Sequence, residues 1–147
     1  MFKWEKFDLT TRWHYHPEVE LIYFIKGKTT GVTGDVFHEF SEGDLVLLGA
    51  DFPHVLQQHP QFAREHPGCE PFGLIIQFTE NFLGNDFLNK AELAPVKQLL
   101  NHAKRGLLFG RAAVKKVAAL LLDMHEQSDS RKLVTLLELL ALLSDGN

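Results

Sequence analysis

The hydrophobic pattern of this chain changes its period near Thr79, and that change constrains the fold more than any other feature. Before Thr79, apolar residues fall in short runs that are separated by turns, several of which contain glycine. Such runs predict antiparallel strands, and strands that are short and evenly spaced favour a small barrel or jelly roll over a parallel sheet. The predicted strands are 19–25, 28–33, 36–40, 45–48, 54–58 and 72–78.

Residues 59–71 interrupt this pattern, because they contain three prolines and show no hydrophobic period, so we expect a loop there. After Thr79 the apolar residues recur with the period of an amphipathic helix. The predicted helices are 92–102, 111–126 and about 130–144.

The last of these helices carries more leucine residues than packing against one neighbouring helix would bury. Its apolar side chains cover an arc of roughly 220° around the helix axis. Burying one leucine contributes about 1.5–3 kcal/mol, so leaving part of the arc in water would be costly. We expect one part to pack on the preceding helix and the rest to contact a second copy of the chain; burial within one subunit is the alternative. The predicted dimer residues are Leu133, Leu136, Leu137, Leu140 and Leu143.

The size of the chain fits one domain. A chain of 147 residues with 45% hydrophobic residues can bury a sizeable core. The single cysteine, Cys69, excludes an intramolecular disulfide and suits a reducing compartment. The first residues lack the apolar run of a signal peptide, and no run reaches the roughly 18 apolar residues of a membrane span. We therefore expect a cytoplasmic protein.

The charge distribution argues against direct nucleic-acid binding by these residues. Residues 1–79 hold 6 Lys/Arg against 11 Asp/Glu, a net charge of −5, and residues 80–147 hold 9 against 8, a net charge of +1, which together give −4. Neutralisation of phosphates dominates nucleic-acid affinity, so a binding domain shows a basic stripe. Neither half of the chain has one.

Three residues near the start of the first long apolar run have side chains of the types that bind metals. In an extended segment alternate side chains share a face, so His14, His16 and Glu20 point the same way if Pro17 adds no bulge. Imidazole nitrogen and carboxylate oxygen together suit zinc, iron, nickel or manganese. His54, just beyond the 45–48 strand, is a fourth candidate ligand.

The spacing of these residues resembles the two motifs of the cupin superfamily. His14, His16 and Glu20 match the first motif, which ends at a glycine, and His54 matches the histidine of the second. The resemblance implies that these three histidines and the glutamate are metal ligands. The second motif departs from the cupin pattern at three positions, which this chain fills with Gly49, Asp51 and Gln58.

A longer match covers nearly the whole chain. The segments 14–27, 42–49 and 53–55, followed by a helical tail, resemble the N-terminal sensing domain of AraC-family transcription regulators. The resemblance implies a mainly β fold with an α-helical C-terminal extension. It places a cupin barrel with the effector pocket over residues 1–79. A helical extension over residues 80–147 then packs on the barrel and makes the dimer contact.

The same resemblance leaves the role of the histidines open. Sensing domains of this type usually bind an organic ligand, often without a metal, so the imidazoles and the carboxylate can instead orient an effector by hydrogen bonds. Aromatic and histidine side chains nearby add candidates for the pocket wall. The predicted ligand-binding residues are Trp13, His14, His16, Glu20, Tyr23, His38 and His54.

Three functions follow from this pattern. The first is a ligand-sensing domain that dimerises and controls DNA binding by a C-terminal helix-turn-helix domain absent from these residues, with a small polar effector such as a carbohydrate. The second is a stand-alone metal-dependent cupin enzyme, a dioxygenase or an isomerase. The third is a binding module without catalysis. The helical extension favours the first, because a minimal cupin enzyme does not need it. The sequence contains neither a nucleophile with a neighbouring base nor a dinucleotide fingerprint, so it does not indicate another enzyme class.

Overall fold

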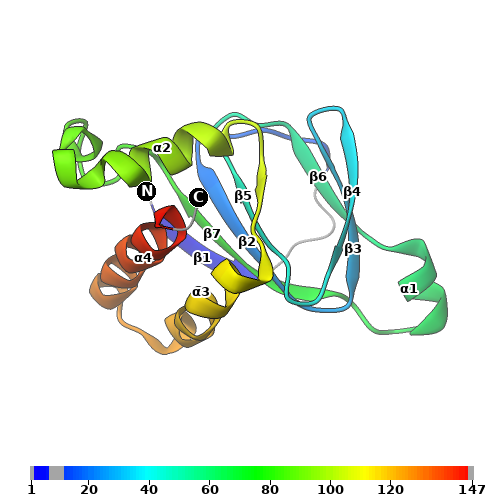
Figure 1. Ribbon diagram of the computed structural model, residues 1–147. Coiled ribbons are helices and arrows are strands. Elements are labelled where there is room, and N and C mark those ends of the chain that lie inside the picture. The colour runs from blue at the N-terminus through cyan, green and yellow to red at the C-terminus, as the bar shows by residue number, and fades with distance from the viewer. Residues whose placement is uncertain (1, 7–11, 146–147) are drawn as a thin grey trace.

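The computed structural model describes residues 2–6 and 12–145 of the chain. Two antiparallel sheets face each other, with helices against the outer side of the larger one (Figure 1). The larger sheet has the strand order β1-β7-β2-β5-β8 and the smaller one β4-β3-β6. The strands are β1 Phe2–Lys6, β2 Val19–Lys26, β3 Lys28–Thr33, β4 Val36–Ser41, β5 Leu45–Leu48, β6 His54–Gln58, β7 Phe72–Phe78 and β8 Leu107–Leu108.

The barrel expected from the sequence is instead an open sandwich. Among the described residues, strand ladders form only within each sheet, and the sheets are not closed into a barrel. The chain crosses between sheets at two glycines in the left-handed region, Gly27 with φ +85° and Gly43 with φ +84°. The Gly43 N–H donates to the Phe24 carbonyl at 2.7 Å, which fixes the second crossing to β2. The sharp turns bring the strands face to face without joining their edges.

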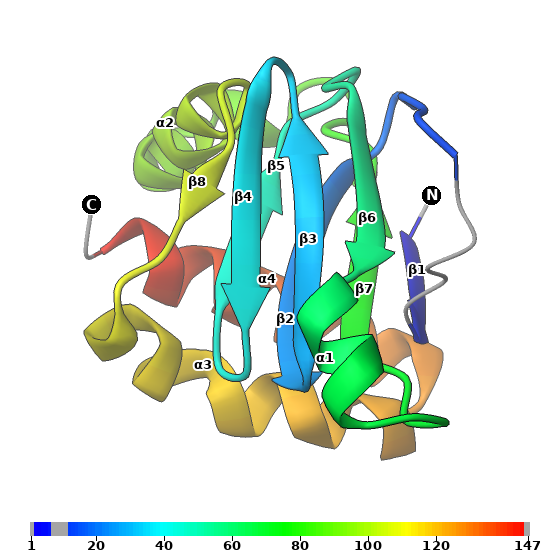
Figure 2. The ribbon, with the colours of Figure 1, turned by 90° about the vertical axis from the view of Figure 1, so that its right-hand side faces the viewer.

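The space between the sheets holds a small apolar core. Figure 2 shows β4, β3 and β6 lying across β2, β5 and β7. Side chains that alternate along these strands meet in the middle, as expected for a sandwich. The buried members of this inner core are Ile22, Phe24, Phe40, Val46, Leu48, Leu56 and Ile75.

The helical half follows the sequence prediction closely. The helices are α1 Pro60–Glu65, α2 Ala94–Ala103, α3 Arg111–Asp123 and α4 Asp129–Ser144, with 3-10 turns η1 Phe87–Asn89, η2 Ala91–Leu93 and η3 Met124–Glu126. No helix of the described ranges is long and apolar enough to cross a membrane.

Helix α1 lies where the sequence predicted a loop. The His59 side chain accepts a hydrogen bond from the Gln61 N–H at 3.2 Å, and Pro60 occupies the first turn, where its missing N–H costs nothing. The prediction failed because a six-residue helix with no buried residue has no hydrophobic period to detect.

The outer face of the five-stranded sheet carries the main core of the molecule. Strand residues such as Val19, Leu21 and Leu47 pack there with residues of α2, α3 and α4, and each of these three is at most 1% exposed. Figure 1 shows the three helices gathered on this side of the sheet. The two sides of one sheet therefore serve different cores.

This packing changes the interpretation of the leucine-rich last helix. Leu136, Leu140 and Leu143, predicted to lie in a dimer interface, are at most 1% exposed within the single chain. Helix α4 contacts both α2 and α3 as well as the sheet, so the wide apolar arc finds partners inside one subunit. Leu133 and Leu137, the other two predicted dimer residues, are half-buried.

Candidate metal and ligand site

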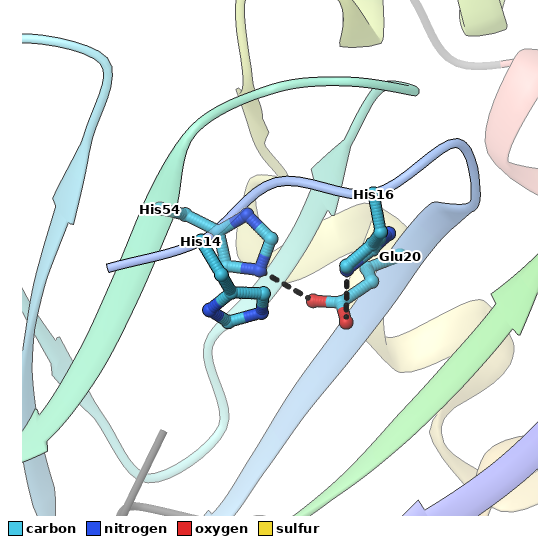
Figure 3. A group of neighbouring side chains, drawn as sticks. All are labelled: His14, His16, Glu20 and His54. Carbon is cyan, nitrogen blue, oxygen red and sulfur yellow. Dashed lines mark hydrogen bonds and ion pairs between the residues drawn. The ribbon is translucent and has the colours of Figure 1, made fainter. Parts of the chain in front are cut away.

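Four polar side chains converge at one end of the space between the sheets (Figure 3). His14 and His16 come from the irregular segment before β2, Glu20 is the second residue of β2, and His54 opens β6. His14 and His54 exchange two backbone hydrogen bonds, of 3.1 and 2.9 Å. This bridge holds the incoming segment against β6, so that the histidines face Glu20.

The four ligand atoms lie within 4.8 Å of one another. His16 Nε2 lies 3.0 Å from Glu20 Oε1, and His54 Nε2 lies 3.2 Å from Glu20 Oε2. Glu20 and His54 are each 3% exposed, whereas His14 and His16 are half-buried. The cluster is therefore buried on the inner side and accessible on the side of the two N-terminal histidines.

Backbone carbonyls orient all three imidazoles in the same way. Each Nδ1 lies in hydrogen-bond range of a carbonyl two residues away: His14 with Arg12 at 2.7 Å, His16 with Glu18 at 3.1 Å, and His54 with Phe52 at 2.7 Å. Because a carbonyl only accepts, Nδ1 must carry the proton. This leaves Nε2 of each ring directed at the cluster, the arrangement in which outer contacts prepare histidine for a metal.

The charge on Glu20 is set by its neighbours. Burial alone would raise the pKa of this carboxyl, but hydrogen bonds from His16, His54 and Gln77 hold the pKa well below its ordinary value of 4.5. The hydrogen bond to Glu20 in turn raises the pKa of His16 above its ordinary 6.5. In the metal-free chain the site thus pairs an ionised Glu20 with a His16 whose protonated form is favoured, and a metal ion would take the place of the Nε2 proton.

Gln77 belongs to the site although the sequence analysis did not select it. Its Nε2 donates to Glu20 Oε1 at 2.5 Å, from the position on β7 that pairs directly with Glu20. The sequence did carry a signal, since Gln77 is the one hydrogen-bonding side chain in the otherwise apolar run Phe72–Phe78. Only the strand pairing shows which residue it faces.

The donor set fits a divalent metal. Three imidazole Nε2 atoms and one carboxylate oxygen match the preferences of zinc, iron, nickel and manganese. The four residues predicted from the cupin-like spacing, His14, His16, Glu20 and His54, are the same four that the structure brings together.

The other predicted ligand-binding residues lie apart from this cluster. His38 is on β4, stacks on Phe40 and lines a separate cavity. The Trp13 side chain is 50% exposed. Tyr23 packs against the helix-covered core, because it alternates with Ile22 and Phe24 and so points to the opposite face of β2.

Comparison with known proteins gives a likeness in fold. No protein-family model matches the chain, and no curated protein matches it either. Apo ToxT of Vibrio cholerae, an AraC-family regulator, in a single-substitution form, has a TM-score of 0.56 at 13% identity, over 98% of this chain and 53% of ToxT. Wild-type ToxT with a bound unsaturated fatty acid has a TM-score of 0.51 at 11% identity, over 98% and 50%.

A third structure is an iron enzyme. HEPD of Streptomyces albus, with 2-hydroxyethylphosphonate and Fe(II) bound, has a TM-score of only 0.37 at 17% identity, over 97% of this chain and 34% of HEPD. That score is too low to carry an argument. The likeness to ToxT shows a shared fold, and the chain spans about half the length of ToxT.

Proposed function

We propose that this chain is the ligand-sensing and dimerisation domain of an AraC-type transcription regulator. The observation that carries the proposal is the extent of the fold likeness. The alignment with ToxT runs over 98% of the chain, so it includes the helices as well as the sandwich. A cupin-like sandwich alone would not distinguish a sensor from an enzyme, but the added helical half is a feature of the regulator.

In this function a small molecule binds between the sheets and changes the arrangement of the helical half. A ligand shifts such an equilibrium only through its different affinity for the two states. DNA contact then belongs to a C-terminal helix-turn-helix part outside these residues, because neither half of the chain carries a basic stripe. The unsaturated fatty acid bound to ToxT is an effector of that protein, and the effector class here is a separate question.

The His/Glu cluster gives this sensor a polar anchor. His14, His16, Glu20 and His54 would hold zinc, iron, nickel or manganese, and such an ion supplies a Lewis acid that can bind an oxygen of the effector. Without a metal, the same imidazoles and the Glu20 carboxylate offer hydrogen bonds to a polar effector such as a carbohydrate.

The best candidate for a dimer contact is the part of α4 that no other element of the chain covers. Val134 is 51% exposed, and it borders an apolar groove of about 420 Å³ together with Leu137, Phe87 and Leu93. A second copy of the chain would cover this groove. Val134→Glu is expected to halve the mass measured by light scattering, whereas a parent protein that is already a monomer would contradict dimerisation.

The second candidate is a metal-dependent cupin enzyme, a dioxygenase or an isomerase. The observation that favours it is the donor set, because three convergent imidazoles and a carboxylate are the ligand types of catalytic divalent metals. The two functions differ in the fate of the ligand, since a sensor releases its ligand unchanged and an enzyme converts it.

The experiment that separates them measures both quantities on one sample. The chain is loaded with Fe(II) or Zn²⁺, screened against small acids and sugars by thermal shift, and every ligand that raises Tm is then followed by mass spectrometry in air. A sensing domain binds in stoichiometric amount and returns the ligand intact. Turnover of a ligand beyond one equivalent would contradict the sensing role and support the enzyme.

A further inference from the structure

A cavity of about 160 Å³ lies between the sheets and is lined by residues of β3, β4, β5 and the segment that ends in β8. Figure 2 shows β4 of the smaller sheet beside β8 of the larger one. Phe40, Val46 and Leu48 form apolar walls, and Thr33, His38 and Arg105 add polar groups. The cavity therefore combines an apolar interior with hydrogen-bond donors.

The polar groups of this cavity are basic or neutral. No carboxylate is among the residues that line it, although the strand-rich half of the chain carries a net charge of −5. Arg105 is an exposed residue beside this cavity, and among the described residues it has no ion pair, whereas Arg111 pairs with Asp44. An arginine that lines a cavity without a carboxylate partner favours an anionic ligand, which it can hold by two parallel hydrogen bonds.

Close backbone contacts fix the position of Arg105. The Gly49 N–H at the end of β5 donates to the Ala103 carbonyl at 2.7 Å. A Cβ atom at Gly49 would lie 2.8 Å from the Lys104 backbone, so only glycine permits this approach. Gly106 then turns the chain with φ +72° into β8. The backbone on both sides of Arg105 is thus anchored, which fixes the point of the chain from which its side chain reaches the cavity.

The cavity adjoins the His/Glu cluster through direct strand neighbours. Thr33 pairs with His54 across β3 and β6, and Leu48 pairs with Glu20 across β5 and β2. Paired residues point to the same face and lie about one strand spacing apart, roughly 5 Å. The cavity and the cluster are therefore neighbouring parts of one inter-sheet space.

We propose that this cavity binds a small carboxylic acid with a ring-sized apolar body, and that Arg105 is the residue that recognises the carboxylate. A cavity of about 150 Å³ takes up a benzene molecule, so the volume here fits one ring. The ring lies against Phe40, Val46 and Leu48, and His38 and Thr33 provide further polar contacts. This inference rests on the proposed sensing function, since it assigns the effector class of the same inter-sheet space.

The test compares benzoate with benzamide, which has nearly the same shape and no charge. Each is titrated at millimolar concentration into the ¹⁵N-labelled chain, and amide shifts are followed by NMR. Benzoate is expected to shift the amides of Thr33, His38 and Gly106 with saturation, and benzamide to bind at least about tenfold more weakly. No saturable shift with benzoate, or saturable shifts confined to another region of the chain, would overturn the assignment.

Charge variants identify the recognising residue. Arg105→Gln is expected to weaken benzoate binding by about tenfold or more and to leave benzamide binding unchanged. Lys104→Gln is the matched control, because it removes the same charge at an exposed neighbour that does not line the cavity. Equal losses in both variants would mean that net charge, not Arg105, attracts the anion, and would overturn the proposal.

The outcome separates this inference from the proposed function. If benzamide binds as tightly as benzoate, the anionic class is wrong, while a pocket for an uncharged effector remains. If neither probe binds and the thermal-shift screen finds ligands that protect the chain elsewhere, the cavity assignment fails and the sensing role stands. Catalytic turnover of a bound ligand would instead remove the sensing role itself.

Discussion

The two faces of strand β2 pack into different parts of the molecule. Val19, Leu21 and Tyr23 point toward the helices and join the large core, whereas Glu20, Ile22 and Phe24 point between the sheets. The helix-facing side is almost entirely apolar and closed. The inter-sheet side has a smaller core with a buried charged cluster at one end and a cavity beside it.

This difference indicates that the two faces of the sheet have different roles, one in stability and the other in binding. A closed apolar core contributes stability in proportion to the area it buries, whereas a buried carboxylate with three imidazoles costs desolvation free energy unless each partner is in place. We therefore expect substitutions on the helix-facing side to change stability alone. Substitutions on the inter-sheet side are expected to change binding.

The largest expected effect comes from adjacent residues of β5 that point to opposite faces. Leu47→Ala on the helix-facing side should lower the free energy of unfolding by about 2–5 kcal/mol, because it leaves a hole in a fully buried core. Metal and benzoate binding by the folded fraction should stay unchanged. Leu48→Ala should also destabilise the chain, and in addition it should alter benzoate binding, because Leu48 lines the cavity.

Denaturant unfolding and calorimetric titration of both variants measure this difference. Equal effects of Leu47→Ala and Leu48→Ala on benzoate affinity would remove the distinction between the two faces.

The second effect concerns the metal. His16→Ala removes one of four ligands, and since loss of an outer contact alone weakens metal sites by 10–100-fold, loss of a ligand should weaken Zn²⁺ binding by about 100-fold or more. His102→Ala on the exposed face of α2 is the control and should bind like the parent. Calorimetric titration gives both affinities, and an unchanged affinity in His16→Ala would exclude the cluster as the site.

A smaller effect is the pH dependence of the metal-free chain. The lowered pKa of Glu20 adds stability that is present above about pH 4.5 and lost as the pH falls below it. The raised pKa of His16 adds stability that is complete below about pH 6.5 and lost as the pH rises through its folded value. The stability difference between the parent and Glu20→Gln should therefore be largest between these pH values.

Urea unfolding of both proteins across this range checks the expectation. A difference that does not vary with pH would show that the His16–Glu20 contact is not an ion pair.

The smallest expected effect is at Asp51, which has a φ of 58° and is the only non-glycine residue with positive φ in the described chain. This is one of the positions where the chain departs from the cupin motif. Asp51→Gly relieves the side-chain strain but adds chain entropy in the unfolded state, so the net gain should be at most about 1 kcal/mol. A shift of Tm measures it, and a clear loss of stability would mean that the Asp51 side chain makes a useful contact.

Much of the fold could be read from the sequence because the hydrophobic periods are clear. Strands β2 to β7 and the three longer helices lie within a few residues of their predicted bounds. Closure of the sheets could not be read, since it depends on which strand edges pair across the sandwich. Part of the leucine arc of α4 was predicted to contact a second copy of the chain. The sequence pattern shows how wide the apolar arc is, but it does not show how many elements of the same chain pack around the helix.

The site was predictable in composition but not in local geometry. His14 and His16 were expected on an extended strand, yet they lie in an irregular segment that the backbone bridge to His54 holds in place. The spacing still selected the four residues that the structure brings together. Gln77 and Arg105 were missed, because their approach to the inter-sheet space depends on strand register and on the contact at Gly49.

The sensing role is tested most directly by sequencing the coding DNA beyond the codon for residue 147. If the chain is the sensing domain of an AraC-type regulator, the reading frame continues into two helix-turn-helix patterns with recognition helices rich in Lys and Arg. A stop codon directly after residue 147 would contradict that role and would favour the metal-dependent enzyme.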